Sequence, residues 1–361
     1  MTVHLNVVLD QLVSPTQPEL EMASRELAGA LVAAAPAGCE VVGLMPSGAV
    51  ESLPGVGVRS LKLPRRELAA AWQVGVPTGA AGGMIHSPTL MAPLVKHDRV
   101  HDHDQTVVTV WDLRAWESPD ELPRPRAMFE RAMLKRAVKY ADAVVVPTHA
   151  LAERLGGIAR LGDRVRVIAG AAPSGFRAPN DAVARLRDLG LPHTFVALAG
   201  GVGASHGLAD GLRAVAAAGV DAVVLDVAEG DEPALADIAS AAGLPERRVH
   251  ARGSLDRYDR AAVLASASAF VAPAVGHSWP WRVVEVLALG TPVVAAESDV
   301  HHEVIADGGV IVHVEDLGEA LKQLTASPEA LQRAKVLSSD RARAFAWDAA
   351  AERVWHLHAE L

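Results

Sequence analysis

Short apolar runs alternate with longer amphipathic, Ala-rich stretches along this chain, and the alternation occurs twice. The pattern is typical of βαβ units built around a parallel sheet. The expected strands of the first half lie near 5–9, 40–44, 84–86, 106–110 and 143–147, with helices near 19–34 and 128–140. Those of the second half lie near 195–199, 222–226, 249–252, 269–272 and 292–295. The sequence therefore predicts an α/β protein.

The two halves are joined by residues 168–181, which are rich in Gly, Pro and Ala and show no periodicity, so we interpret them as a linker. A chain of 361 residues exceeds one ordinary core, which favours two domains. We predict an N-terminal domain over 1–175, a C-terminal domain over 176–340 and a final amphipathic helix over 341–361. Ligands of such domains bind outside the carboxyl ends of the strands and in clefts between domains.

Composition narrows the class of protein. Half of the residues are hydrophobic and no low-complexity tract occurs, so the chain should fold. The net charge of −9 argues against a general nucleic-acid binder. Cys39 is the single cysteine, which excludes a disulfide within the chain and fits a reducing compartment. No apolar run approaches the roughly 20 residues of a membrane span, so we expect a cytoplasmic protein whose membrane contact, if any, is peripheral.

The segment VGHSWPWRVVEVLALGTPVVAA, residues 275–296, carries the clearest motif. It places Glu285 at an expected helix start, ends that helix on Gly290 and continues into a buried strand. This segment resembles the donor-sugar signature of glycosyltransferase family 4, in which a Glu, seven residues and a second Glu precede such a helix and strand. Glu285 matches the second Glu, whereas His277 stands where the family has the first.

Weaker similarities extend the resemblance over nearly the whole chain. Residues 86–94 look like the family's His-x-Pro loop, 107–113 like its strand ending in His-Asp, and 195–215 like its donor phosphate loop. The last helix, with Trp347 and Trp355, resembles a terminal helix that crosses back to the first domain. The resemblance implies a GT-B architecture, with two Rossmann-like domains facing across a cleft.

The resemblance also implies a donor site for a nucleotide sugar such as a UDP- or GDP-sugar, with no cofactor and no metal. The family has an Arg and a Lys in its phosphate loop where this chain has Gly201 and His206. Glu285 would accept hydrogen bonds from the ribose, although an acid stabilising the helix dipole is the alternative. Arg282 could replace the missing positive charge. His206, if protonated, could partly replace the Lys, and it could equally be a solvated loop residue. The donor-binding residues expected are Glu285, His206, Gly207, Gly201, Arg282 and Val284.

Three residues are candidates for catalysis. Asp112 follows Trp111, which replaces the His that often precedes this Asp, and a helix cap or turn residue is its alternative. His86 is expected at the cleft edge on the acceptor side, with a buried histidine as the alternative. His277 can make one hydrogen bond to the sugar but cannot act as a carboxylate.

Two other patterns suggest rival chemistries. The loop GGVGASHG between a strand and a helix, with Asp226 after the next strand, distantly fits a dinucleotide-binding fingerprint. Such loops usually follow the first strand of a chain, which disfavours a nicotinamide enzyme. Residues 97–104 hold three His and three Asp, which suggests a metal site, but a solvated polar turn is simpler.

A basic helix is expected over 123–140. Six basic residues accompany a single acid, Glu130, in this stretch. The cations that could rest on an anionic membrane are Arg124, Arg131, Lys135 and Lys139, and the side chains expected to face inward are Met128, Phe129 and Met133. A solvated helix face is the alternative.

Two hypotheses follow. In the first, the protein is a retaining, hexosyltransferase-type enzyme that extends a glycan or lipid-linked acceptor for the cell envelope or for export. In the second, it is a catalytically silent GT-B protein that binds a nucleotide, a glycan or a partner glycosyltransferase. We favour the first because Glu285 and remnants of the His-x-Pro and phosphate loops are retained at the expected cleft.

Overall fold

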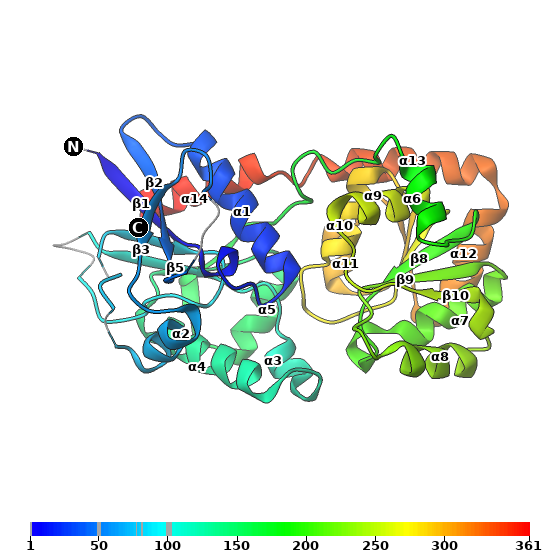
Figure 1. The fold of residues 1–361 in the computed structure, drawn as a ribbon, viewed down its shortest axis with the longest axis horizontal. Coiled ribbons are helices and arrows are strands. Elements are labelled where there is room, and N and C mark those ends of the chain that lie inside the picture. The colour runs from blue at the N-terminus through cyan, green and yellow to red at the C-terminus, as the bar shows by residue number, and fades with distance from the viewer. Residues whose placement is uncertain (1, 49–51, 77, 81, 99–102) are drawn as a thin grey trace. The chain divides into compact units, whose positions relative to one another are not determined.

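The computed structural model describes residues 2–48, 52–76, 78–80, 82–98 and 103–361. Its contacts divide the chain into two compact units (Figure 1). Unit 1 comprises Met1–Ser174, His277–Trp279 and Ala346–Leu361, and unit 2 comprises Gly175–Gly276 and Pro280–Phe345.

Unit 1 is built on a seven-stranded parallel sheet in the order β3-β2-β1-β4-β5-β6-β7. Its strands are β1 Val3–Val8, β2 Cys39–Met45, β3 Gly57–Ser60, β4 Met84–Ser87, β5 Gln105–Thr109, β6 Ala143–Val146 and β7 Val165–Val167. β5 and β6 are buried along their whole length, because apolar side chains of α4 and α5 pack on them.

The helices of unit 1 are α1 Pro18–Ala33, α2 Arg65–Val74, α3 Arg114–Glu117, α4 Arg124–Tyr140, α5 His149–Ile158 and α14 Trp347–Glu360. The C-terminal helix α14 packs on α1. Trp355 Nε1 donates to the carbonyl of Leu31 at 3.0 Å, and Trp347 Nε1 donates to that of Ala172 at 3.0 Å. The last helix is thus part of unit 1, although its residues follow unit 2 in the chain.

Unit 2 contains a six-stranded parallel sheet in the order β10-β9-β8-β11-β12-β13. Its strands are β8 Phe195–Ala199, β9 Asp221–Leu225, β10 Val249–Ala251, β11 Phe270–Ala272, β12 Val293–Ala296 and β13 Val310–Val312. Its helices are α6 Ala182–Asp188, α7 Leu208–Ala218, α8 Glu232–Ala241, α9 Arg257–Ser266, α10 Trp281–Leu289, α11 Asp299–Val304, α12 Leu317–Ala326 and α13 Pro328–Ala342. The sheet is built outward in both directions from β8, so the strand order reverses between β8 and β11.

The prediction of an α/β protein with two parallel sheets is confirmed, and each expected strand is present within a few residues. Three strands were not expected, namely β3, β7 and β13. All three are edge strands, and their side chains are exposed or half-buried. An edge strand lacks the continuous apolar run that burial on both faces demands, so the hydrophobic pattern did not reveal them.

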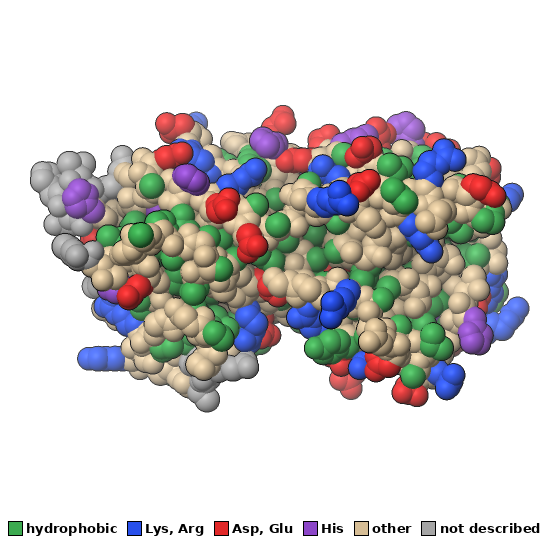
Figure 2. Space-filling view, turned by 90° about the horizontal axis from the view of Figure 1, so that it is seen from above, with side chains coloured by type: hydrophobic (Ala, Val, Ile, Leu, Met, Phe, Trp, Pro, Cys, Tyr) green, Lys and Arg blue, Asp and Glu red, His purple; other side chains and the backbone are tan. Residues whose placement is uncertain are grey.

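Surface charge and helix hydropathy bear on possible partners. On the face drawn in Figure 2, basic and acidic side chains are interspersed rather than gathered by sign. Among the described residues, no helix combines the length and the hydropathy that crossing a bilayer requires.

Candidate functional site

The glycine loop of unit 2 lies between β8 and α7. Gly200 and Gly207 both have positive φ, at +139° and +65°. A Cβ on Gly207 would lie 2.8 Å from the carbonyl oxygen of Pro273, so only glycine fits this close approach. The His206 ring lies against the same loop, because a Cβ on Gly200 would come within 2.8 Å of its Nδ1 and one on Gly201 within 3.7 Å of the ring. The loop therefore brings a histidine and bare backbone to the start of α7.

Glu285 is buried between two arginines. Its side chain is 2% exposed, and each carboxylate oxygen lies 3.1 Å from Nε of Arg260. Arg282 Nη1 donates to Oε2 at 3.2 Å. Because α10 begins at Trp281, Glu285 lies beyond its first turn, which contains no acid. The expectation of a carboxylate at the helix start is wrong, and the helix-dipole interpretation fails with it.

Arg282 connects Glu285 to a second carboxylate. Its Nε and Nη2 donate to the two oxygens of Asp226 at 2.8 and 3.0 Å, which is the bidentate geometry of a strong ion pair. Asp226 directly follows β9 and has a φ of +64°. The neighbouring Val284 is 1% exposed and faces the core. The charge of Arg282 is thus shared between two acids.

His277 belongs to unit 1 and is held by Glu117. Its backbone N–H donates to Oε2 of Glu117 at 3.1 Å, and its Nδ1 lies 2.8 Å from Oε1. Arg154 Nε donates to the same Oε1 at 2.9 Å. When Glu117 accepts the Nδ1 proton, Nε2 is left as the acceptor of a ring that is about one quarter exposed.

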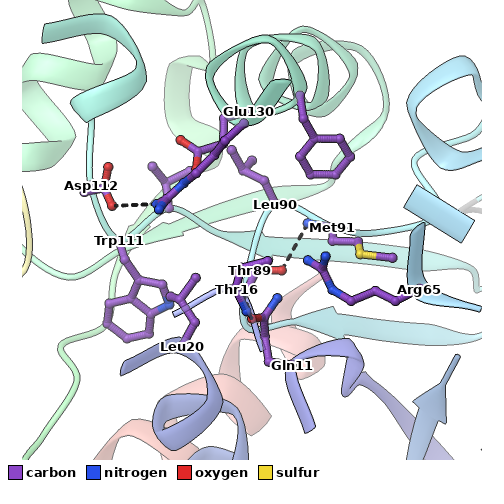
Figure 3. Close-up of a pocket in the computed structure, with 13 residues that line it drawn as sticks. Gln11, Thr16, Leu20, Arg65, Thr89, Leu90, Met91, Trp111, Asp112 and Glu130 are labelled. Atoms are coloured by element: carbon purple, nitrogen blue, oxygen red, sulfur yellow. Dashed lines mark hydrogen bonds and ion pairs between the residues drawn. The ribbon is translucent and has the colours of Figure 1, made fainter. Parts of the chain in front are cut away.

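A cavity of about 90 Å³ lies within unit 1 (Figure 3). This volume can hold several water molecules or a hydroxyl-bearing group. Figure 3 shows Asp112 and Glu130 at one end and Arg65 at the other. The lining residues are Gln11, Thr16, Leu20, Arg65, Thr89, Leu90, Met91, Val110, Trp111, Asp112, Arg126, Phe129 and Glu130.

Asp112 takes part in a local turn and also lines the cavity. Its Oδ1 accepts from the backbone N–H of Arg114, two residues later, at 3.0 Å, as in an Asx turn, whereas the N-cap position of α3 is occupied by Leu113. Its Oδ2 pairs with Arg114 at 3.3 Å and with Arg126 at 3.8 Å, and its carboxylate lines the cavity. Arg126 Nε also donates to Glu130 at 2.8 Å. Burial and then the nearby Asp112 charge raise the pKa of Glu130.

The opposite end of the cavity rests on a buried acid that the sequence did not single out. Asp10 is 0% exposed, and its Oδ2 accepts from Gln11 Nε2 at 2.6 Å and from Arg65 Nε at 2.7 Å. Its Oδ1 has no partner. Burial raises the pKa of Asp10, although Arg65 acts in the opposite direction. The carboxylate fixes the side chains of Arg65 and Gln11 at the cavity wall.

His86 does not lie at an accessible edge, which corrects its expected position. It is 1% exposed on β4, and neither ring nitrogen has a hydrogen-bond partner among the described residues. Its ring makes an edge contact with His358 of α14, with centroids 5.6 Å apart. Burial lowers its pKa well below the usual value. In this conformation His86 is a core residue.

Trp111 and Trp279 are also buried, at 7% and 3% exposure. Trp111 Nε1 donates to the carbonyl of Pro88 at 2.7 Å, so its ring is fixed where it lines the cavity. Both indoles lie against Gly170, where a Cβ would come within 3.1 Å of each.

The His- and Asp-rich segment 97–104 is only partly described, since residues 99–102 lie outside the described residues. Nε2 of His97 lies 2.8 Å from Asp142, and the carboxylate of Asp142 also accepts from the N–H of Thr106. Within the described ranges, no group of three His, Cys, Asp or Glu side chains converges as metal ligands would.

On α4 the four cations expected to face solvent, Arg124, Arg131, Lys135 and Lys139, are exposed. Met133 is buried and Phe129 half-buried, as expected. Met128 is 67% exposed, so the expectation that it faces inward is wrong. Its position, four residues after Arg124, places it on the same side of the helix as the cations.

Comparison with known proteins adds to this geometry. Residues 196–327 match the family model described as glycosyl transferases group 1. The matched segment contains the glycine loop, Asp226 and Glu285, all within unit 2. A phosphatidyl-myo-inositol mannosyltransferase from Mycobacterium leprae (strain TN) is 31% identical over 157 residues. That match covers 42% of this chain and only 41% of the relative.

Two solved structures are similar over the full length. A sucrose-phosphate synthase from Thermosynechococcus elongatus has a TM-score of 0.72 at 18% identity, covering 99% of this chain and 98% of that one. Anabaena HepE in complex with UDP and glucose has a TM-score of 0.71 at 15% identity, covering 99% and 100%. At these identities the likeness shows the fold, which is that of the GT-B glycosyltransferases.

Sequence reasoning missed several residues that build these sites, namely Asp10, Arg65, Glu117, Arg126 and Arg260. Arg260 lies 25 positions before Glu285, and Glu117 lies 160 positions before His277. No local motif marks either pairing. Only Asp10 carried a usable signal, because it directly follows the first expected strand, where parallel sheets place functional polar residues.

Proposed function

We propose that the protein is a glycosyltransferase that transfers a hexose from a nucleotide sugar to a hydroxyl of a glycan or lipid-linked acceptor. The supporting observation is the position of the group 1 match. It covers the glycine loop and Glu285, which stand at the carboxyl side of one parallel sheet. Ligands of parallel α/β sheets bind at that side.

The donor proposed is a UDP- or GDP-sugar, with UDP tested first because HepE, a structural neighbour, binds UDP and glucose. The ribose would hydrogen-bond to Glu285, whose orientation Arg260 and Arg282 fix. The diphosphate would lie on the glycine loop, where the start of α7 contributes about 0.3–1 kcal/mol and His206 adds charge when protonated. Gly201 and Gly207 let the backbone approach closely, and Val284 supports α10 from the core.

The acceptor is proposed to use the cavity of unit 1. Its wall presents carboxylates and guanidiniums together, with Trp111 and Phe129 as apolar surfaces. Paired acceptors and donors of this kind suit the hydroxyls of a neutral sugar, and an aromatic ring suits its apolar face. Asp112 and His277, the latter through Nε2, are the groups proposed to contact the reacting sugars. The resemblance implies a retaining outcome, which anomeric analysis of the product tests.

The first experiment is calorimetric titration of the protein with UDP, GDP and their common sugar conjugates. Glu285→Gln and His206→Ala should each weaken the binding of the preferred nucleotide by about tenfold, equivalent to about 1.4 kcal/mol. Glu319→Gln, an exposed acid on α12, is the matched control and should bind normally. Unaltered secondary structure in each variant keeps the comparison valid. If no nucleotide binds to the wild-type protein, the transferase proposal fails.

A second candidate function is a catalytically silent subunit that binds a nucleotide, a glycan or a partner glycosyltransferase. It is favoured by one observation, that His277 and Arg282 are already paired with carboxylates of the protein. Release of UDP from a UDP-sugar, with and without candidate acceptors, separates the two functions. Tight nucleotide binding without turnover over the whole acceptor set would favour the silent subunit.

For a lipid-linked acceptor, the protein would work in the cytoplasm at an anionic membrane, bound through α4. The mannosyltransferase relative, whose name includes phosphatidyl-myo-inositol, supports this choice. The cations of α4 and the exposed Met128 share one side of the helix, as an interfacial helix requires. The double variant Arg131→Glu, Lys135→Glu should lose binding to phosphatidylglycerol vesicles in flotation. Arg333→Glu, Lys335→Glu on α13 makes the same change of charge and should bind normally.

A further inference from the structure

The ion pair between Arg282 and Asp226 lies at a point in unit 2 where a ligand is expected. Strand order reverses between β8 and β11, and open parallel sheets bind ligands outside the carboxyl ends of the strands at such a reversal. Asp226 follows β9, on one side of β8, whereas Arg282 lies on α10, which follows β11 on the other side. The pair therefore joins segments from the two sides of β8.

The same pair adjoins the glycine loop. The N–H of Gly200 donates to the carbonyl of Leu225 at 3.0 Å, and Leu225 directly precedes Asp226. The first residue of the glycine loop therefore lies next to the residue that precedes Asp226. A diphosphate held by this loop would approach the guanidinium that Asp226 now holds.

We propose that Asp226 is a stand-in for the donor diphosphate on Arg282, and that the nucleotide binds by displacing it. The inference rests on the proposed function and extends it, since it makes Asp226 a residue that sets donor affinity. The geometry is suitable, because a guanidinium that is bidentate to a carboxylate at 2.8 and 3.0 Å can hold a phosphate in the same way.

Exposure indicates which of the two carboxylates would leave. The side chain of Asp226 is 26% exposed, whereas that of Glu285 is 2% exposed and also bound by Arg260. The carboxylate of Asp226 can therefore turn into solvent at little cost in free energy, while Glu285 remains paired with Arg282. Removing the buried Glu285 would instead leave Arg260 without its carboxylate, and Arg282 with Asp226 alone.

The charges around Arg282 favour replacement of Asp226 by an anionic ligand once Asp226 has turned away. Arg260 and Arg282 face Glu285 and Asp226, so this network carries no net charge. When Asp226 turns away, the remaining three groups carry one positive charge, which attracts a diphosphate. Asp226 thus opposes anion binding in the free protein, and this opposition is what a substitution can remove.

Asp226→Asn is the variant that tests this inference. Asparagine also tolerates the left-handed backbone that Asp226 adopts, so the loop keeps its conformation. The variant should bind UDP, and inorganic pyrophosphate as a separate probe, at least fivefold more tightly than the wild type, equivalent to about 1 kcal/mol. Asp237→Asn, an exposed acid on α8, is the matched control and should bind like the wild type.

Adding Arg282→Gln to Asp226→Asn should abolish the gain, because the released cation is then missing. Asp226→Ser provides a second test if the Asn variant folds poorly. Wild-type affinity for UDP in folded Asp226→Asn and Asp226→Ser would overturn the stand-in role and leave the proposed function intact. A gain for pyrophosphate without any UDP binding would support the stand-in but remove the proposed function. If neither probe binds any variant, both are refuted.

Discussion

Acid should destabilise unit 1 because two histidines are held neutral in its core. His358 Nδ1 lies 2.9 Å from the side-chain oxygen of Gln105, and its ring contacts that of His86. Burial lowers the pKa of His358 to about 4, and burial together with the neighbouring His358 lowers that of His86 well below its usual value. The charge of Asp142 acts on the pKa of His358 in the opposite direction, with a smaller effect than burial. We predict a free energy of unfolding that falls steeply below pH 6.5.

The magnitude follows from proton linkage. An unfolded histidine binds a proton below about pH 6.5, whereas folded His358 does so only near pH 4. Between these values the unfolded chain binds more protons, so stability falls by about 1.4 kcal/mol for each pH unit and each such histidine. From pH 6.5 to pH 5, His358 alone removes about 2 kcal/mol, and His86 acts in the same direction. Above pH 6.5 neither histidine changes the stability.

Urea unfolding between pH 7 and pH 4.5, followed by tryptophan fluorescence, measures this effect. All tryptophans except Trp281 belong to unit 1, so the signal reports chiefly on that unit. His358→Gln should flatten the decrease with pH by about 1.4 kcal/mol per unit. His356→Gln, an exposed residue two positions earlier on the same helix, should keep the wild-type slope. Equal slopes for His358→Gln and the wild type would refute the reasoning.

Two further predictions concern the walls of the candidate sites. Arg65→Gln leaves Asp10 buried without its cation and should lower the free energy of unfolding by about 3 kcal/mol at pH 7. Part of this stability should return in acid, as Asp10 takes up a proton. Arg66→Gln, at an exposed position, should change the free energy of unfolding little in the same urea titration. Gly207→Ala should destabilise unit 2 by more than Gly219→Ala in thermal unfolding. Both positions require the left-handed backbone, costing about 1 kcal/mol, but only Gly207 meets a backbone oxygen.

The buried parts of the fold were predictable from the sequence because each central strand is a continuous apolar run. β12 illustrates this, since the glycine stop at Gly290 and the run that follows fix both its start and its burial. The half-buried strand β13 gave no such signal. The C-terminal helix was expected to return to the first domain from its resemblance to a family helix, whereas periodicity alone only required it to pack somewhere.

The candidate sites were less predictable, because their chemistry depends on pairings between distant residues. The motif drew attention to Glu285, but nothing near it in the sequence indicates Arg260 or Asp226. The position of His86 in an expected strand could not show whether its side chain lies in a cavity or in the core. Its contact with His358, on a helix more than 250 residues later, makes it a core residue.

Three polar residues at or beside the motif positions have a common physical property, which is that each is already paired with other residues of the protein. Arg282 is bound by Asp226, His277 by Glu117, and Asp112 by arginines. A ligand that binds such groups must replace an existing partner, so its net affinity is the difference between two similar interactions. At Arg282, only a ligand group that offers more charge than the resident Asp226 carboxylate gains from the exchange. A diphosphate meets this condition at Arg282, and a single hydroxyl does not, which is why we assign the donor rather than the acceptor to that position.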